Sequence, residues 1–312
     1  GNYQLIVTDT LNGCSSQDAV AVTADFAIPM ADAGPPATLN CDQPQLNVDG
    51  SASSQGPDFT YSWTTTGGSI LSGADSPTPM VDAAGAYQLI VLNAANACAD
   101  TAVVTLTEDF TAPAADAGPP QLVTCDQPVV TLGGFSDSGP NITYEWSTND
   151  GDLDGNNAQP DPDVNTGGVY VLTVTNTDNG CTATDQVTID EDQALPVANA
   201  GPDQLLNCAQ PTATLVTTGS SQGPAFNLQW ATLATAPAPM GLDPEVSQAD
   251  TYVLSILNTD NGCANTDTVT VAANFDTPVA DAGPTATLNC DQPVLTLEAS
   301  ASTQGAEIAY QW

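Results

Sequence analysis

The stretch that decides the fold is Tyr170-Val-Leu-Thr-Val-Thr-Asn-Thr-Asp-Asn-Gly-Cys181. Large apolar residues occupy alternate positions at Tyr170, Leu172 and Val174, as expected for a strand with one buried face. The pair Asn179-Gly180 follows, and it favours a hairpin because both residue types tolerate positive φ. The stretch therefore predicts a β-hairpin. Because the rest of the chain shows the same period of two, we expect no amphipathic helix.

Four kinds of residue mark an internal repeat. Tryptophans are separated by 83, 84 and 82 residues, and each of two cysteine series is spaced by 84, 83 and 82. A tyrosine lies 11 residues before every cysteine of the second series. The markers are Trp63, Trp146, Trp230 and Trp312; Cys41, Cys125, Cys208 and Cys290; Cys14, Cys98, Cys181 and Cys263; and Tyr3, Tyr87, Tyr170 and Tyr252. They define a unit of about 83 residues.

Each unit predicts six or seven short strands, the number typical of an immunoglobulin-like sandwich. The expected fold is all-β, a tandem array of such sandwiches. Complete repeats are predicted at 27–110, 111–193 and 194–276, the last two strands of a repeat at 1–26, and the first strands of another at 277–312. Neither end supplies a counterpart of the 21 residues at 64–84. Two interpretations stay open: a cut through a continuous array, and ends that another chain completes by strand exchange.

The composition excludes many classes of function. The chain has 312 residues, 37 of them Asp or Glu, and no Lys, Arg or His, which gives a formal charge of −37. Without His and Lys, the common nucleophile, general-base and Schiff-base chemistries are missing. Without cations, nucleic acid and anionic lipid are repelled. We expect no enzyme, no cofactor and no nucleic-acid partner. No run of 18 apolar residues occurs, so we expect no direct membrane insertion.

Several motifs resemble a known family, the PKD-type repeat. They are Val197-Ala-Asn-Ala-Gly-Pro-Asp-Gln204, Gly219-Ser-Ser-Gln-Gly-Pro224, Leu228-Gln-Trp230 and Tyr252-Val-Leu-Ser-Ile256, and they recur in the other units. The cysteine-bearing form resembles arrays on surface adhesins of Bacteroidota. This resemblance implies tandem immunoglobulin-like sandwiches on secreted or surface proteins of bacteria, with no shared catalytic residues.

The cysteines predict disulfides. Eight are present with no His and no Cys-x-x-Cys, which argues against zinc and redox catalysis and favours an oxidising, extracellular compartment. The strand order implied by the PKD-type resemblance puts the first series after the first strand and the second series after the last hairpin turn. Three outcomes stay open: pairs within repeats (Cys41–Cys98, Cys125–Cys181, Cys208–Cys263), pairs between neighbouring repeats (Cys41–Cys181, Cys125–Cys263), and free thiols.

One loop has the spacing of calcium ligands. Asp150, Asp152 and Asp154 alternate, Gly155 is sixth and Asp161 is twelfth, as in EF-hand loops whose last ligand is Glu. The sequence therefore predicts a Ca²⁺ site here, with a solvated turn as the alternative.

Four residues are candidates for glycosylation. Asn141-Ile-Thr143 fits the N-linked acceptor pattern. Thr10, Thr101 and Thr268 each follow Asp and precede an apolar residue, which resembles the O-glycosylation acceptor of Bacteroidota.

The sequence thus favours a non-enzymatic extracellular or cell-surface structural protein, a stalk or filament of stacked repeats that self-associates into fibres or stacks end to end. The alternatives are an adhesin that binds glycans or proteins through loops such as 150–161 and 231–245, and accessory repeats of a secreted enzyme.

Overall fold

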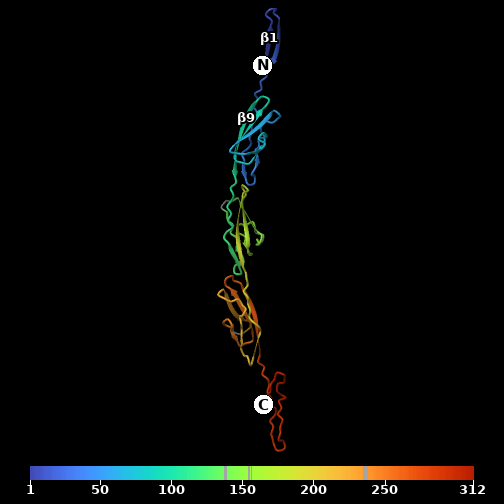
Figure 1. Cartoon of the computed structure of the whole chain (residues 1–312), viewed down its shortest axis with the longest axis vertical. Coiled ribbons are helices and arrows are strands. Elements are labelled where there is room, and N and C mark those ends of the chain that lie inside the picture. Colours follow the sequence, from blue (N-terminus) through green and yellow to red (C-terminus); the bar gives the residue numbers. More distant parts are fainter. Residues whose placement is uncertain (137–138, 154, 156, 235–237) are drawn as a thin grey trace. The chain divides into compact units, whose positions relative to one another are not determined.

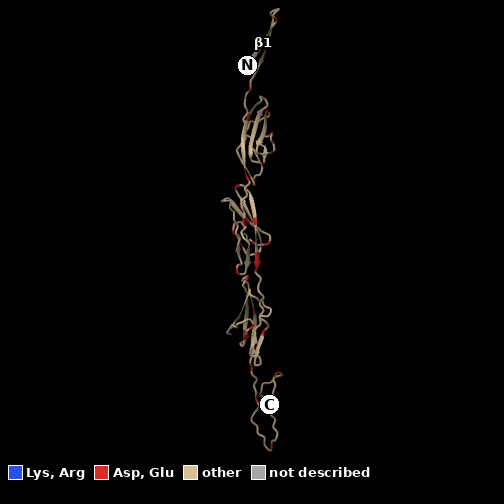
Figure 2. Cartoon of the chain, turned by 60° about the vertical axis from the view of Figure 1, so that its left-hand side comes forward, with Lys and Arg blue, Asp and Glu red and all other residues tan. Residues whose placement is uncertain are grey.

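The structure is a computed structural model of residues 1–312, and it describes all of them except 137–138, 154, 156 and 235–237. Every regular element of the described residues is a β-strand (Figure 1). Accordingly, the described part of the chain contains no helix that could cross a membrane. The chain forms two compact units, Gly1–Gln121 with Val129–Asp190 and Leu122–Pro128 with Glu191–Trp312. Asp and Glu are spread along the chain, and Lys and Arg are absent (Figure 2).

The chain begins with an isolated hairpin and continues into a complete sandwich. Strands β1 (Asn2–Thr8) and β2 (Ser15–Ala21) pair only with each other, and all their side chains are exposed. The next strands are β3 (Thr38–Asn40), β4 (Leu46–Asn47), β5 (Phe59–Thr66), β6 (Ile70–Ser72), β7 (Met80–Val81), β8 (Gly85–Asn93) and β9 (Cys98–Asp109). They form a four-stranded sheet, β3-β9-β8-β5, and a three-stranded sheet, β4-β7-β6.

Alternation along the strands creates the core of this sandwich. In β8, Tyr87, Leu89 and Val91 are fully buried, and Leu89 pairs across the sheet with Trp63 of β5. The other buried members of the cluster are Ala33, Val48, Val81, Val104 and Leu106. The residues that the period of two assigns to one face are therefore the residues that leave water, which is the main driving force for folding.

The later strands repeat this arrangement. They are β10 (Gln121–Thr124), β11 (Val130–Thr131), β12 (Ile142–Thr148), β13 (Asp163–Val164), β14 (Gly168–Asn176) and β15 (Thr182–Asp192), then β16 (Gln204–Asn207), β17 (Ala213–Thr214), β18 (Phe226–Thr232), β19 (Glu245–Val246), β20 (Asp250–Asn258) and β21 (Ala264–Asn274). Their four-stranded sheets run β10-β15-β14-β12 and β16-β21-β20-β18. The short strands pair as β11-β13 and β17-β19.

Buried aromatic groups make the same two bonds in every complete repeat. A tyrosine hydroxyl donates to the carbonyl four residues upstream: Tyr87 to Ala83 (2.6 Å), Tyr170 to Thr166 (2.8 Å) and Tyr252 to Gln248 (2.9 Å). An indole N–H also donates to a backbone carbonyl: Trp63 to Ser76, Trp146 to Pro160 and Trp230 to Leu242. A tyrosine corner and a buried Trp on the third strand are hallmarks of immunoglobulin sandwiches. The expected all-β array of immunoglobulin-like sandwiches is confirmed.

Residues 277–312 differ from the expectation. The sequence predicts the first strands of a repeat there, but this described segment contains no strand. In the complete repeats the first strand pairs with the last one, as β3 does with β9, and the third pairs with β8 or its equivalent. No strand equivalent to β8 or β9 pairs with 277–312, so the backbone of this segment joins no sheet.

Candidate functional site: the cysteine junctions

Two disulfides join neighbouring repeats. Cys41 bonds to Cys181 with a Cα–Cα distance of 5.0 Å, and Cys125 bonds to Cys263 with a Cα–Cα distance of 4.9 Å. In each bond, a first-series cysteine of one repeat meets the second-series cysteine of the next. We call each such contact a junction.

The pairing within repeats does not form, and the parallel pairing of the first and last strands explains why. In the first complete repeat, Asn40 at the end of β3 lies opposite Asp109 at the end of β9. Cys98 precedes Asp109 by 11 residues, which is roughly 35 Å along the strand. A disulfide needs Cα atoms within about 7 Å. Cys41 and Cys98 therefore lie at opposite ends of the same sheet.

The first-series cysteine lies in a tight turn that hydrogen bonds within its own repeat close. Asn40 donates its N–H to the Gln43 carbonyl (3.2 Å), and Gln43 donates its N–H to Asn40 Oδ1 (2.8 Å). The equivalent turn at Cys125 is closed by Thr124 and Gln127. The N–H of Cys41 then points to the neighbouring repeat, where it donates to the carbonyl of Asn179 (2.9 Å).

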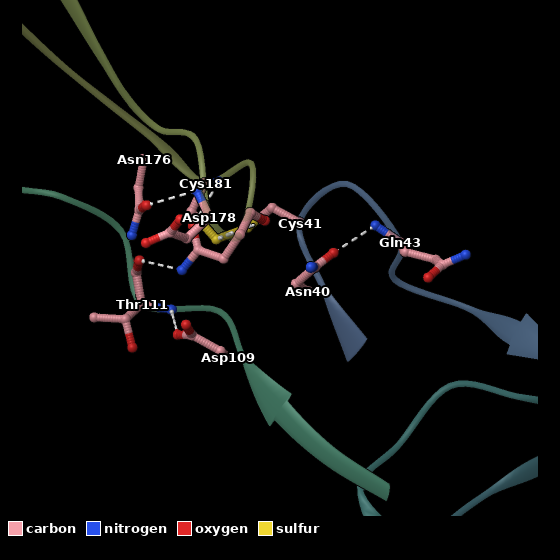
Figure 3. Close-up of a disulfide and its surroundings, with 9 residues drawn as sticks. Asn40, Cys41, Gln43, Asp109, Thr111, Asn176, Asp178 and Cys181 are labelled. Carbon is pink, nitrogen blue, oxygen red and sulfur yellow. Dashed lines mark hydrogen bonds between the residues drawn. A yellow bond between two sulfur atoms is a disulfide. The ribbon is translucent and has the colours of Figure 1, made fainter. Parts of the chain in front are cut away.

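Figure 3 shows the Cys41–Cys181 disulfide of this junction and its surroundings. The other half of the junction is organised by Asn179. Its Oδ1 accepts the N–H of Cys181 (3.0 Å), and its Nδ2 donates to the carbonyl of Thr111 (3.0 Å). Its carbonyl also accepts the N–H groups of Cys41 and Asp42. Asn179 and Cys181 are 2% and 1% exposed. The buried Asn179 thus contacts the hairpin turn at Cys181, the turn at Cys41 of the preceding repeat, and Thr111 between the two repeats.

Asp109, the last residue of β9, adds a charged hydrogen-bond acceptor to the first junction. The Thr111 N–H donates to Asp109 Oδ1 (3.1 Å; Figure 3). Hydrogen bonds from the Thr111 N–H, the Thr111 hydroxyl and the Asn179 side chain hold the pKa of Asp109 below its usual value. These bonds favour the ionised carboxylate because charge-assisted hydrogen bonds are stronger than neutral ones.

The second junction repeats this geometry within its own unit. Asn261 Oδ1 accepts the N–H of Cys263 (2.9 Å), and Asn261 Nδ2 donates to Asp192 Oδ1 (2.9 Å) and to the Ala194 carbonyl (3.1 Å). The N–H of Cys125 donates to the Asn261 carbonyl (3.0 Å). Asn261 and Cys263 are buried as well. The same set of contacts recurs at both junctions, which indicates a specific interface between neighbouring repeats.

The role of these asparagines was not predicted from the sequence. The pair Asn179-Gly180 was predicted as a hairpin turn because both residue types tolerate positive φ, and of the two only Gly180 adopts it, at +70°. A Cβ on Gly180 would overlap the Asp42 carboxylate, and one on Gly262 would overlap that of Asp126. The available signal was an Asn two residues before every second-series cysteine, at Asn12, Asn96, Asn179 and Asn261.

Four cysteines carry free thiols in the structure: Cys14, Cys98, Cys208 and Cys290. Their turns are already formed. Asn207 and Gln210 exchange backbone hydrogen bonds around Cys208, and Asn289 and Gln292 do so around Cys290. The N–H groups of Cys14 and Cys98 donate to Asn12 Oδ1 and Asn96 Oδ1, as in the junctions. Each free cysteine therefore presents half of a junction.

The structure places part of the predicted calcium loop. Asp150 Oδ1 accepts the N–H of Val169 (2.9 Å), and the Asp152 N–H donates to the Tyr170 hydroxyl (3.2 Å). Asp154 lies outside the described residues. Among the described residues no three His, Cys, Asp or Glu side chains group as a metal site. The Ca²⁺ site with Asp161 stays a prediction.

The glycosylation candidates Thr10, Thr101, Thr268 and Asn141 are all exposed. Two of the neighbouring acids have other contacts, since Asp100 accepts the N–H of Ala31 and Asp267 that of Ala200. Asn141 donates its amide to Asp178 (2.8 Å). Modification of these residues stays a prediction.

No protein-family model matches the chain, and no curated protein matches it. Solved structures similar to it include an I-band fragment of titin (12% identity, 80% of this chain and 100% of that one, TM-score 0.38). Others are the insect immune protein hemolin (14%, 88% and 82%, TM-score 0.29) and Drosophila N-cadherin (11%, 88% and 83%, TM-score 0.31). The assignment of an immunoglobulin-like sandwich rests on the strand order and core of the chain itself.

Proposed function

We propose that the chain is a non-enzymatic structural array of the bacterial cell exterior, in which disulfide clasps hold successive sandwiches together under load. The observation that carries this proposal is the pairing of each first-series cysteine with the second-series cysteine of the next repeat. Disulfides of this kind persist in oxidising compartments. The PKD-type resemblance supports a secreted or surface setting.

The clasps shorten the covalent path along which tension travels. Without them, tension passes through every residue from Gly1 to Trp312. With both bonds closed, the shortest path runs from Gly1 to Cys41, from Cys181 back to Cys125, and from Cys263 to Trp312. A repeat that unfolds under load therefore releases only part of its length.

Single-molecule pulling between the two termini tests this function. At about 3.5 Å per residue we expect the oxidised chain to stretch to roughly 500 Å and the reduced chain to roughly 1,100 Å. The double variant Cys41→Ser and Cys125→Ser should reach the longer value without reductant. An oxidised wild-type chain that also reaches roughly 1,100 Å would contradict the proposal.

A further inference from the structure

Both junctions contain a chemically reactive dipeptide, an asparagine followed by a glycine. The two pairs are Asn179-Gly180 in the first junction and Asn261-Gly262 in the second. In such a pair the backbone nitrogen of the glycine can attack the side-chain carbonyl carbon of the asparagine, because a glycine has no Cβ to obstruct the approach. Asparagine is accordingly counted among the thermolabile residues of proteins. The amide that organises each junction is therefore also a group that the chain can lose.

The closed first junction blocks this attack. The Asn179 side chain is held at both ends, since Oδ1 accepts the N–H of Cys181 (3.0 Å) and Nδ2 donates to the Thr111 carbonyl (3.0 Å). The N–H of Gly180 must lose its proton before the nitrogen reacts, and it donates to the Asn176 carbonyl (2.8 Å). Asn179 is 2% exposed, so the water that would remove this proton has little access. The closed junction thus holds Asn179 in a geometry that does not react.

The second junction holds its asparagine in the same way. Asn261 Oδ1 accepts the N–H of Cys263 (2.9 Å), and Asn261 Nδ2 donates to Asp192 Oδ1 (2.9 Å). The N–H of Gly262 donates to the Asn258 carbonyl (2.8 Å), and Asn261 is 2% exposed. The protection of the Asn-Gly pair is therefore a shared property of the two junctions.

The disulfide fastens the turn that covers each Asn-Gly pair. In the first junction, the N–H of Cys41 donates to the Asn179 carbonyl (2.9 Å), and the Asp42 carboxylate lies directly against Gly180. The bond from Cys41 to Cys181 attaches this turn covalently. When the disulfide is reduced, only hydrogen bonds keep the turn in place, and local opening becomes more frequent. Reduction therefore increases the time during which the asparagine can react.

We propose that Asn179 and Asn261 are deamidation sites that the disulfides protect, so that reduction of a disulfide exposes its asparagine to an irreversible change. In the first junction, the Gly180 nitrogen forms a bond to Asn179 Cγ, the Cγ–Nδ2 bond breaks, and ammonia leaves with the amide proton of the glycine. Water then opens the cyclic imide and yields aspartate or isoaspartate, so no oxidant is needed. This inference goes beyond the proposed function, because it concerns the Asn-Gly turns whether or not the array bears load.

The product of deamidation does not fit the closed junction. A carboxylate only accepts hydrogen bonds, so it cannot donate to the Thr111 carbonyl as the Asn179 amide does. It would also lie beside the Asp109 carboxylate, which accepts a hydrogen bond from the Asn179 side chain, and like charges in one site repel. At the second junction the new carboxylate would face Asp192 Oδ1. A disulfide that has been open long enough for deamidation should therefore re-form poorly.

Variants of the full chain that lack one disulfide test the protection. The first-junction variant and the second-junction variant replace with Ser the two cysteines of one disulfide, Cys41 and Cys181 or Cys125 and Cys263. After incubation in mildly alkaline buffer, digestion with an acid-specific protease and mass spectrometry measure the deamidated fraction of each asparagine. We expect the first-junction variant to deamidate Asn179 about tenfold faster than the wild type, because modification follows the population of the open state. Asn261 should keep its wild-type rate there, and the second-junction variant should show the reverse.

Two controls separate opening of the junction from unfolding of the repeat. Gly180→Ala, added to the first-junction variant, should slow the deamidation of Asn179 because the new Cβ obstructs the attack. Hydrogen exchange of the β14 amides should match that of the wild type. An unchanged rate at Asn179, an equal acceleration at Asn261, faster exchange in β14 or no effect of Gly180→Ala would each overturn the protection.

Asn179→Asp tests whether the product prevents closure, and Asn176→Asp is its matched control. Both place one carboxylate in the same hairpin, but Asn176 Oδ1 accepts the N–H of Asp178 (3.0 Å), which a carboxylate does equally well. In a dithiol buffer, we expect Asn179→Asp to shift the reduction equilibrium of Cys41–Cys181 about tenfold toward the thiols, and Asn176→Asp to leave it unchanged. Equal effects of the two changes, or no effect of Asn179→Asp, would overturn the irreversibility. Such a result would leave the proposed function standing if the oxidised wild-type chain still stops at the shorter length on pulling.

Discussion

Asn179 shows how one side chain holds two repeats. Its amide and carbonyl groups contact the hairpin turn, the linker and the disulfide turn, and it is almost fully buried. A buried amide with all its hydrogen bonds satisfied fixes one geometry, because any other arrangement would leave polar groups unpaired. The hydrogen bonds of Asn179 and the disulfide therefore hold Cys41 and Cys181 in the same geometry.

Gly180→Ala should weaken the first junction. The residue has φ of +70°, which costs an L-residue about 1–2 kcal/mol, and the new Cβ would displace the Asp42 carboxylate. We expect Cys41–Cys181 to be reduced more readily in a dithiol buffer, as measured by mass spectrometry, while Cys125–Cys263 is unchanged. Adding Asp42→Ala should restore part of the loss, since the carboxylate is then gone. No change in the reduction equilibrium would rule out this packing role of Gly180.

Asp109 should make the first junction sensitive to acid. Its pKa is lowered in the folded state, so the carboxylate contributes stability above its unfolded pKa of about 3.9. That contribution is lost as the pH falls through the lower, folded pKa. We expect ¹³C NMR to show the Asp109 carboxyl titrating with a pKa below the usual value of an Asp side chain. Asn179→Ala should move its pKa upward; an unchanged titration would mean that the junction bonds do not hold the carboxylate.

At the scale of the element, the hairpin that ends each repeat serves two interfaces. Its first strand supplies the buried tyrosine and the alternating core residues, and its turn supplies the Asn and Cys of the junction. In the last complete repeat, burial and the nearby Asp250 carboxylate raise the pKa of Tyr252. The strand that anchors the core thus also positions the turn that reaches the preceding repeat.

Tyr252→Phe should loosen that hairpin. The change removes the hydroxyl of the buried Tyr252 that donates to the Gln248 carbonyl, and a hydrogen bond of this kind contributes about 0.5–1.5 kcal/mol. We expect faster hydrogen exchange of the β20 amides. Tyr3→Phe, at the equivalent but exposed position, is the control and should leave exchange in β1 unchanged. Equal effects at both positions would argue against the tyrosine corner.

The sequence predicts the strands well because their alternation is local. The buried residues of β8, β14 and β20 all follow from the period of two seen at Tyr170, Leu172 and Val174. The disulfide pairing could not be chosen from the sequence, because it depends on β3 lying parallel to β9 and on which strand ends meet. The segment 277–312 contains no strand for a related reason, because a strand forms only beside a partner strand.

At the scale of the whole molecule, the dominant property is a single sign of charge. The sequence has no Lys, Arg or His to set against its 37 Asp and Glu residues. Attractive ion pairs therefore contribute almost nothing to stability, and the long-range electrostatic term is repulsive. Such a field keeps the chain soluble and opposes compaction.

Salt should stabilise the fold. Raising NaCl from about 20 mM to about 500 mM shortens the Debye length from about 20 Å to about 4 Å and screens the repulsion between carboxylates. Because almost no ion pair exists to be weakened, we expect the unfolding midpoint to rise by a few degrees. Calorimetry measures it, with a neutral osmolyte at matched viscosity as control. A midpoint that falls with salt would show that attraction outweighs repulsion.

The two disulfide loops overlap, and this overlap protects the chain against fragmentation by proteolysis. Residues 41–181 lie in one closed loop and residues 125–263 in the other, so every peptide bond between Cys41 and Cys263 belongs to at least one ring. A protease that nicks the backbone once anywhere in that range leaves a single covalent molecule. The two fragments produced by such a cut stay covalently joined until a reductant opens the disulfides.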